Sequence, residues 1–297
     1  MVRVHSGAGA GMSINKLLLQ AAGSTTGPGF GEGDPFDGWD GWNSFWFGGN
    51  ASAYYNGTST NYGDTYGGSY KNSFSSDGLI YYNSSEAGIY QWILSTPYNL
   101  ATASLDYTFT DAKTTFITSH FFNKNGTKVV VYAPGQIVSY DLNTPWDLET
   151  FTNKKTYTGT IAPNTSTGGI AMHPNGDRLY LCLRFGAPTT IREFSLTPGD
   201  ASTIQIVKDT VISGGASTWY GIQFDGVGSK VYLGDRDGRN IYTYSLSSPY
   251  DLTTASLVET QASWGADAWG IDFTHDGDIL WLGNGSGSSG DVIKYEK

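Results

Sequence analysis

The sequence predicts an all-β fold, a five-bladed β-propeller of four-stranded blades closed by an N-terminal strand and preceded by an extended arm with a short helix. A recurring glycine, a recurring strand pattern and a recurring proline turn predict it. Five times a large apolar residue is followed four positions later by glycine: Phe74 and Gly78, Phe122 and Gly126, Met172 and Gly176, Phe224 and Gly228, and Phe273 and Gly277. The glycine steps of 48, 50, 52 and 49 residues fit one four-stranded blade.

The glycines separate the first two strands of each predicted blade. A strand-like run follows each glycine, so the apolar residue ends one strand and the glycine turns the chain into the next. The innermost strands are therefore expected at residues 70–74, 118–122, 168–172, 220–224 and 269–273. A third strand reads aliphatic, x, x, aromatic, x, Leu at residues 89–94, 137–142, 191–196 and 241–246, and residues 292–297 keep its first four positions.

A proline turn and a fourth strand complete the repeat. The turn reads Pro97-Tyr98-Asn99-Leu100, Pro145-Trp146-Asp147-Leu148 or Pro249-Tyr250-Asp251-Leu252, and the third repeat keeps only Pro198-Gly199-Asp200. Proline presets φ, and Asn or Asp can close an Asx-type turn. Fourth strands follow near Ser104, Thr152, Ile204 and Ser256.

The last repeat has no fourth strand of its own, which would leave an unpaired edge that invites aggregation. Upstream, residues 50–55 resemble residues 102–107, so we expect a strand at Ala51 to Tyr55 to complete the C-terminal blade and close the ring. The predicted domains are an N-terminal arm, residues 1–49, and a propeller, residues 50–297.

The composition of the chain limits the classes of partner that we expect for it. The formal charge of −10 opposes binding to a phosphate backbone, so nucleic acid is not an expected partner. No apolar run approaches the roughly 18 residues of a membrane span, so no membrane insertion is expected. The single cysteine, Cys182, lies in an apolar run and is interpreted as a core residue.

The arm, residues 1–49, differs from the repeats in its sequence pattern. Ser13 can cap a helix that Gly23 can end, with one apolar face formed by Ile14, Leu17, Leu18 and Ala21. About ten residues are too few for a helix that is stable alone in water. A Gly/Ser/Thr linker leads to an aromatic run that includes Phe36, Trp39, Trp42 and Trp46. These aromatic residues either pack beneath the propeller or dock on another subunit, and a partner is expected to hold the arm.

No catalytic or metal site is recognisable. His5, His120, His173 and His275 are interpreted as surface turn residues, because their positions would not bring three ligands to one zinc ion. Asp272 is the only acidic residue of the predicted innermost strands, which disfavours the carboxylate pair of a glycosidase. We therefore predict no enzymatic activity and no catalytic residue.

Two aspartate groups are candidate calcium ligands: Asp34, Asp37 and Asp40, and separately Asp235 with Asp237. Neither completes a calcium-loop pattern, and ordinary Asp-Gly turns are the alternative. The prediction is that the chain holds no cofactor, with calcium as the one candidate.

Aromatic residues gather at the starts of the predicted innermost strands, at one end of the channel. They are Tyr70, Trp219, Tyr220, Trp264 and Trp269. Flat rings beside polar side chains suit sugar faces, so these residues are candidate glycan contacts. Core packing between blades is the alternative for the same residues.

Two stretches carry a resemblance. Residues 12–23, Met-Ser-Ile-Asn-Lys-Leu-Leu-Leu-Gln-Ala-Ala-Gly, resemble the start of structural proteins of tailed marine bacteriophages, notably those of cyanobacteria. Residues 244–256 are similar to propeller repeats in such virion proteins and in some bacterial surface proteins. The resemblance implies a virion component whose N-terminal segment docks on other virion proteins and whose variable domain faces outward. The resemblance implies a start at Met12, and Met1 to Gly11 departs from that pattern.

The function expected from these observations is that of a non-enzymatic virion protein in a homo- or hetero-oligomeric assembly, serving as a capsid decoration or as a tail-associated or fibre module. Its propeller would stabilise the particle or adhere to a host-surface glycan. The alternative is a cell-surface lectin whose propeller binds glycans. A propeller hydrolase is a third reading, which the lack of paired carboxylates disfavours.

Overall fold

The computed structural model describes residues 60–64, 70–85, 87–111, 117–133, 135–157, 159–161, 167–183, 190–213, 219–235, 237–262, 268–273, 279–284 and 290–296. Within these residues the chain is all-β, and its helical segments are the short 3₁₀ helices η2 (Leu100–Thr102), η3 (Leu148–Thr150) and η4 (Leu252–Thr254). The arm, with the predicted helix and aromatic run, lies outside them, and so does the proposed boundary at residue 49.

Consecutive strands form four antiparallel four-stranded sheets, which we call blades 1 to 4. Blade 1 contains β2 (Lys71–Phe74), β3 (Ile80–Ser85), β4 (Gly88–Leu94) and β5 (Ala103–Phe109). Blade 2 contains β6 (Ser119–Phe122), β7 (Lys128–Ala133), β8 (Gln136–Leu142) and β9 (Phe151–Thr156). Blade 3 contains β10 (Thr167–Met172), β11 (Arg178–Leu183), β12 (Thr190–Thr197) and β13 (Asp200–Val211). Blade 4 contains β14 (Trp219–Phe224), β15 (Lys230–Asp235), β16 (Asn240–Leu246) and β17 (Ala255–Ala262).

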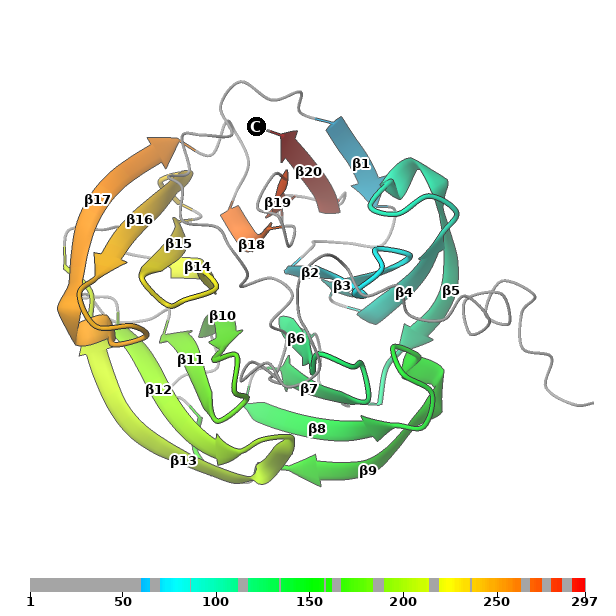
Figure 1. Cartoon of the computed structure of the whole chain (residues 1–297), viewed down its shortest axis with the longest axis horizontal. Coiled ribbons are helices and arrows are strands. Elements are labelled where there is room, and N and C mark those ends of the chain that lie inside the picture. Colours follow the sequence, from blue (N-terminus) through cyan, green and yellow to red (C-terminus); the bar gives the residue numbers. More distant parts are fainter. Residues whose placement is uncertain are drawn as a thin grey trace, which may run out of the picture.

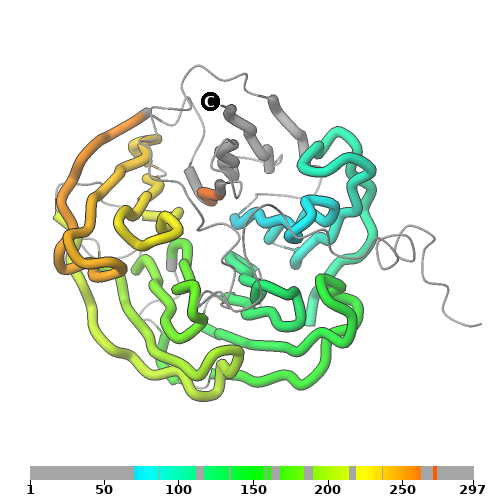
Figure 2. Tube along the Cα trace, in the orientation of Figure 1, coloured from blue at the N-terminus to red at the C-terminus, as the bar shows by residue number. Residues whose placement is uncertain are grey.

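A further four-stranded sheet, the composite sheet, joins the two ends of the strand order as β18 (Ala268–Phe273), β19 (Ile279–Asn284), β20 (Gly290–Glu296) and β1 (Thr60–Asp64). The sheets are arranged around a common centre (Figure 1), and Figure 2 follows the chain around it through blades 1 to 4. The predicted all-β propeller of four-stranded blades is confirmed. The predicted number of blades is not shown: four blades consist of consecutive strands, and the composite sheet takes its strands from both ends of the strand order.

The closing strand was predicted at the wrong place. β1 runs antiparallel to β20, with Thr60 opposite Lys294 and Asp64 opposite Gly290, whereas Ala51 to Tyr55 lies outside the described residues. The links from the fourth strand of one sheet to the first strand of the next lie at residues 110–118, 157–166, 212–218 and 263–267, and residues 65–70 make a link of similar length from β1 to β2. A strand ending at Tyr55 would need a link longer than any of these.

The recurring glycine and the recurring proline turn form one structural unit. Gly126 has a φ of +68°, and the backbone N–H of Trp146 donates to its carbonyl over 2.8 Å. A Cβ on Gly126 would come within 2.4 Å of the Trp146 ring, which also packs on Phe122 with ring centroids 5.3 Å apart. Blades 1 and 4 repeat this arrangement with Phe74, Gly78 and Tyr98 and with Phe224, Gly228 and Tyr250.

The predicted Asx turns are confirmed, and in three blades each caps a 3₁₀ helix. The side chains of Asn99, Asp147 and Asp251 accept from the backbone N–H two residues on, over 3.2, 3.1 and 3.1 Å. In blade 3, Asp200 accepts from the Ser202 N–H over 3.1 Å without a helix. The proline turn therefore keeps its hydrogen bond even where its aromatic residue is missing.

Apolar side chains pack between neighbouring blades. One buried cluster joins blades 1 and 2, a second joins blades 2 and 3, and a third joins blades 3 and 4. Cys182 belongs to the third cluster and is fully buried, as predicted, and burial raises the pKa of its thiol. Among the described residues, none of the helices has the length and apolar character needed to cross a membrane.

Candidate functional site

The candidate site is the centre of the ring, where β2, β6, β10, β14 and β18 lie innermost (Figure 1). These strands coincide with the predicted innermost strands to within one residue at either end. Glycines let their backbones approach closely. A Cβ on Gly168 would come within 2.2 Å of the Trp219 carbonyl oxygen, and one on Gly270 within 2.6 Å of the Tyr70 carbonyl oxygen. The ring is therefore tightly packed at its centre.

A buried ammonium group joins several sheets at this centre. Lys71 of β2 is 4% exposed, and its Nζ lies 3.8 Å from Oδ1 of Asp272 in β18. It donates to Oε1 of Gln223 in β14 over 3.4 Å and lies 5.6 Å from the centroid of the Phe121 ring in β6. One lysine thus contacts the composite sheet and blades 2 and 4. Removing one charge of this buried pair would leave the other uncompensated among the innermost strands.

A buried histidine lies between blades 1 and 2. His120 of β6 is fully buried, and its Nε2 and Nδ1 lie 2.6 Å and 2.5 Å from the hydroxyl oxygens of Ser73 and Ser84. Burial, together with the positive charge of Lys71, lowers the pKa of His120 from 6.5 to about 3. The ring is therefore neutral near pH 7 and both nitrogens make hydrogen bonds. The prediction that His120 is a surface turn residue is wrong, because its strand is innermost and both faces of that strand are covered.

His173 lies in a turn, as predicted, unlike His120. It follows β10 in the turn before β11, and its Nδ1 accepts from the Asn175 N–H over 3.1 Å. Its side chain packs on Tyr250 of blade 4 with ring centroids 4.2 Å apart. Burial lowers its pKa, an effect that Asp177 opposes. It is a turn residue, as predicted, but it is covered by the neighbouring blade rather than open to solvent.

The carboxylates near the centre serve structural contacts. Asp272, predicted as the one acidic residue of the innermost strands, is 1% exposed beside Lys71. Asp225 follows β14 and is 2% exposed; it accepts from the Ser229 hydroxyl over 2.5 Å and from the Lys230 N–H over 3.1 Å. Burial raises the pKa of Asp225, which these hydrogen bonds counteract. Each carboxylate is engaged within the protein, so the arrangement can hold strands and turns in place.

The candidate glycan-binding residues do not share one environment. Trp219 is fully buried and packs edge-on against Tyr242, with ring centroids 5.0 Å apart, and Tyr220 is 5% exposed. Both therefore fit the core alternative, whereas Tyr70 is half-buried just before β2. Trp264 lies outside the described residues, as does the side chain of Trp269. Glycan contact by any of them stays a prediction.

Of the candidate calcium ligands, Asp235 and Asp237 form a local turn. Oδ1 of Asp235 accepts from the Asp237 N–H over 3.1 Å, which agrees with the Asp-Gly turn alternative. The part of the chain that the structure describes holds no group of three or more His, Cys, Asp or Glu residues suited to a metal ion. Asp34, Asp37 and Asp40 lie outside it, together with every predicted docking residue of the arm, Ile14, Leu17, Leu18, Ala21, Phe36, Trp39, Trp42 and Trp46.

The central cluster around Lys71 and the burial of His120 were not predicted from the sequence. Lys71 and His120 each lie within four residues of the phenylalanine that ends an innermost strand, Phe74 and Phe122. Both residues lie on strands that were predicted to be innermost, and this position was the signal for their burial.

Comparison with known proteins identifies no family. No family model and no curated protein matches the chain. A solved structure of a putative 6-phosphogluconolactonase from Bacteroides uniformis ATCC 8492 is similar at 18% sequence identity with a TM-score of 0.43. The match covers 66% of this chain and 54% of that chain, so it spans about half the length of the other protein.

Proposed function

We propose that this chain is a non-enzymatic structural protein of a tailed-bacteriophage virion, a capsid decoration or a tail-associated or fibre module anchored by its N-terminal arm. The propeller would be displayed for particle stabilisation or host-surface adhesion. The proposal that the protein is not an enzyme is supported by the burial of the polar residues at the centre of the ring. Lys71, Asp272 and Gln223 are 4%, 1% and 6% exposed. A substrate would have to displace these contacts before reaching the charged groups at the centre of the ring.

The virion part of the proposal rests on the resemblance of residues 12–23 and on the amphipathic face within them. Burial of roughly 300 Å² on that face at about 25 cal/mol per Å² would supply several kcal/mol before ordering costs. Other virion proteins would supply the opposite surface, and the localisation proposed is the virion.

We further propose that the composite sheet acts as the fifth blade of a closed ring. Its strand order, β18, β19, β20 and β1 from the centre outward, repeats the order within blades 1 to 4. The pair Lys71 and Asp272 links its innermost strand to blade 1. Closure by a strand from the other end of the chain leaves no blade with a missing outer strand.

The experiment is co-sedimentation of the full chain with purified particles. Leu17→Asp with Leu18→Asp should release an otherwise folded propeller, and Leu105→Asp, on an exposed position of β5, serves as the matched control. A double variant that stays bound at wild-type stoichiometry would show that the arm is not the anchor.

The second candidate is a glycan-binding lectin, which the half-buried Tyr70 beside the centre favours. A glycan array with the full chain tests it. Binding that Tyr70→Ala abolishes while the melting temperature is unchanged would support the lectin. A flat array would count against it.

A further inference from the structure

The turn between the first two strands carries an Asn-Gly pair in blades 2 and 3. The pairs are Asn125 with Gly126 and Asn175 with Gly176. Both asparagines are exposed, and both glycines have a positive φ, +68° and +70°. Asparagine is a thermolabile residue, and a following glycine lacks the Cβ that would keep its backbone nitrogen away from the asparagine side chain. Each pair is therefore a candidate site for chemical loss of the side-chain amide.

This loss requires no reagent other than water. The glycine nitrogen bonds to Cγ of the asparagine, the Cγ–Nδ2 bond breaks, and ammonia leaves with the proton of the glycine nitrogen. Water then adds to either carbonyl of the resulting succinimide and opens it to aspartate or to isoaspartate. In the folded turns the glycine N–H is occupied: that of Gly126 donates to the Asn123 carbonyl over 2.8 Å, and that of Gly176 donates to the His173 carbonyl over 2.7 Å. Each turn must therefore open locally before its asparagine reacts.

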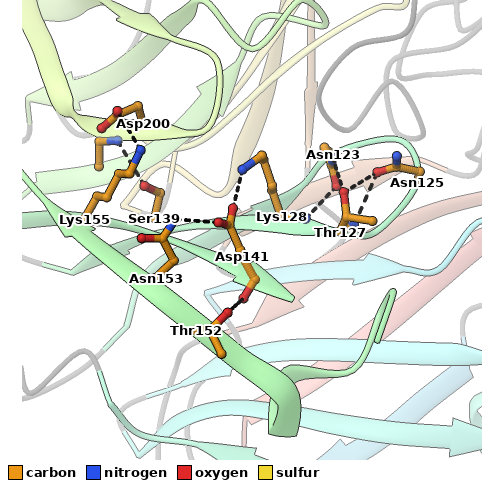
Figure 3. Close-up of polar contacts among 11 residues, drawn as sticks. Asn123, Asn125, Thr127, Lys128, Ser139, Asp141, Thr152, Asn153, Lys155 and Asp200 are labelled. Atoms are coloured by element: carbon orange, nitrogen blue, oxygen red, sulfur yellow. Dashed lines mark hydrogen bonds and ion pairs between the residues drawn. The ribbon is translucent and has the colours of Figure 1, made fainter. Parts of the chain in front are cut away.

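The turn of blade 2 is restrained at both members of its pair. Oδ1 of Asn125 accepts from the Thr127 hydroxyl over 2.7 Å and from the Thr127 N–H over 3.3 Å (Figure 3). The Trp146 N–H donates to the Gly126 carbonyl over 2.8 Å, and the Trp146 ring covers this glycine so closely that a Cβ would come within 2.4 Å of it. Attack on Cγ of Asn125 thus requires several contacts to break together.

In the turn of blade 3, the residue that corresponds to Thr127 is Asp177. A carboxylate has no hydrogen to donate to the amide oxygen of Asn175. Oδ1 of Asp177 lies 3.3 Å from Nδ1 of His173 instead. The same Nδ1 accepts from the backbone N–H of Asn175 over 3.1 Å, a bond that leaves the side-chain amide free to rotate.

The covering ring is also replaced in blade 3. Gly199 follows the proline of its turn, at the position that Trp146 occupies in blade 2. It keeps a positive φ, +76° against +63° for Trp146, but it has no side chain to place over Gly176. Two differences, one at each member of the Asn-Gly pair, therefore favour opening of the blade 3 turn.

We propose that Asn175 is a site of spontaneous deamidation in the folded protein, whereas the turn of blade 2 protects Asn125. Either product places a new carboxylate on an exposed turn, two positions from His173 and from Asp177, in a chain whose formal charge is already −10. Isoaspartate also adds a methylene group to the main chain just before the positive-φ glycine. The modification therefore changes both the charge and the backbone of this turn.

Peptide mapping by mass spectrometry of the full chain, incubated at mildly alkaline pH, tests this proposal. The same chain in denaturant gives the intrinsic rate at each asparagine, and the ratio of the denatured rate to the native rate measures the protection by the fold. We expect protection at Asn125 to exceed that at Asn175 at least about tenfold, because the two hydrogen bonds on the Asn125 amide together contribute about that factor. Equal or greater protection at Asn175 would overturn the proposal.

A reciprocal exchange tests the cause of the difference. Thr127→Asp removes the donor beside Asn125 and should lower protection there by about fivefold, the effect of one hydrogen bond. Asp177→Thr supplies a donor beside Asn175 and should raise protection there by about the same factor. The asparagine in the unaltered turn of each variant is the internal control. Protection that stays unchanged at the altered turn in both variants would refute the assigned cause, and the measurement on the unaltered chain stands even if a variant fails to fold.

Discussion

Gly126→Ala should destabilise the protein more than the loss of a glycine conformation alone predicts. The φ of +68° costs an L-residue about 1 to 2 kcal/mol. The added Cβ would also come within 2.4 Å of the Trp146 ring, and overpacking of this kind typically costs about 1 to 3 kcal/mol. Together these effects predict that the free energy of unfolding falls by about 2 to 5 kcal/mol. Each kcal/mol lost should lower the melting temperature by roughly 2 to 4 °C.

Gly135→Ala is the matched control. Its φ is +82°, but a Cβ there meets nothing within 4 Å, so only the conformational cost of about 1 to 2 kcal/mol applies. Thermal unfolding of Gly126→Ala, Trp146→Ala and the double variant completes a double-mutant cycle. In the Trp146→Ala background, Gly126→Ala should cost no more than Gly135→Ala does. Additive effects in this cycle would refute the idea that glycine and ring form one unit.

Three other predictions concern the centre and the closure of the ring. Because the pKa of His120 is about 3 when folded and about 6.5 when unfolded, the unfolded state binds more protons between these values, so stability falls as pH drops through this window. Denaturation should give a free energy of unfolding about 2 kcal/mol lower at pH 5 than at pH 7, and His120→Asn should remove most of that difference; an unchanged slope would contradict the assignment. Lys71→Met leaves Asp272 buried without its cation and should cost about 3 to 5 kcal/mol, whereas adding Asp272→Asn should recover much of the loss; equal stability of the single and double variants would contradict this. Residues 60–297 should melt near the temperature of the full chain, and residues 65–297, which lack β1, should melt well below it; equal melting temperatures would show that β1 does not stabilise the ring.

Local chemistry made much of the fold predictable from the sequence. The positive φ at Gly78, Gly126, Gly176 and Gly228 demands glycine, so these residues recur at the blade period. The capping side chains of Asn99, Asp147 and Asp251 likewise mark each turn. Such signals are carried by a few adjacent residues, which is why the innermost strands and the Asx turns were predicted close to their observed positions.

Long-range contacts could not be read in the same way. The strand that pairs with β20 is β1, whereas residues 50–55 matched a fourth strand only in composition, which does not determine which segment pairs. His120 resembled a solvent-exposed residue because its two serine partners, Ser73 and Ser84, belong to another blade. The contact between Lys71 and Asp272 joins strands 201 positions apart, which no local pattern reveals.

Quantitative mass spectrometry of purified particles encoded by the same genome tests the central claim most directly. We expect peptides from this chain, from the arm as well as the propeller, at a fixed copy number per particle that survives washing at high salt. Propeller peptides that are absent from the particles, or present at a copy number that falls toward zero as purification proceeds, would contradict the proposal that this chain is a structural component of the virion.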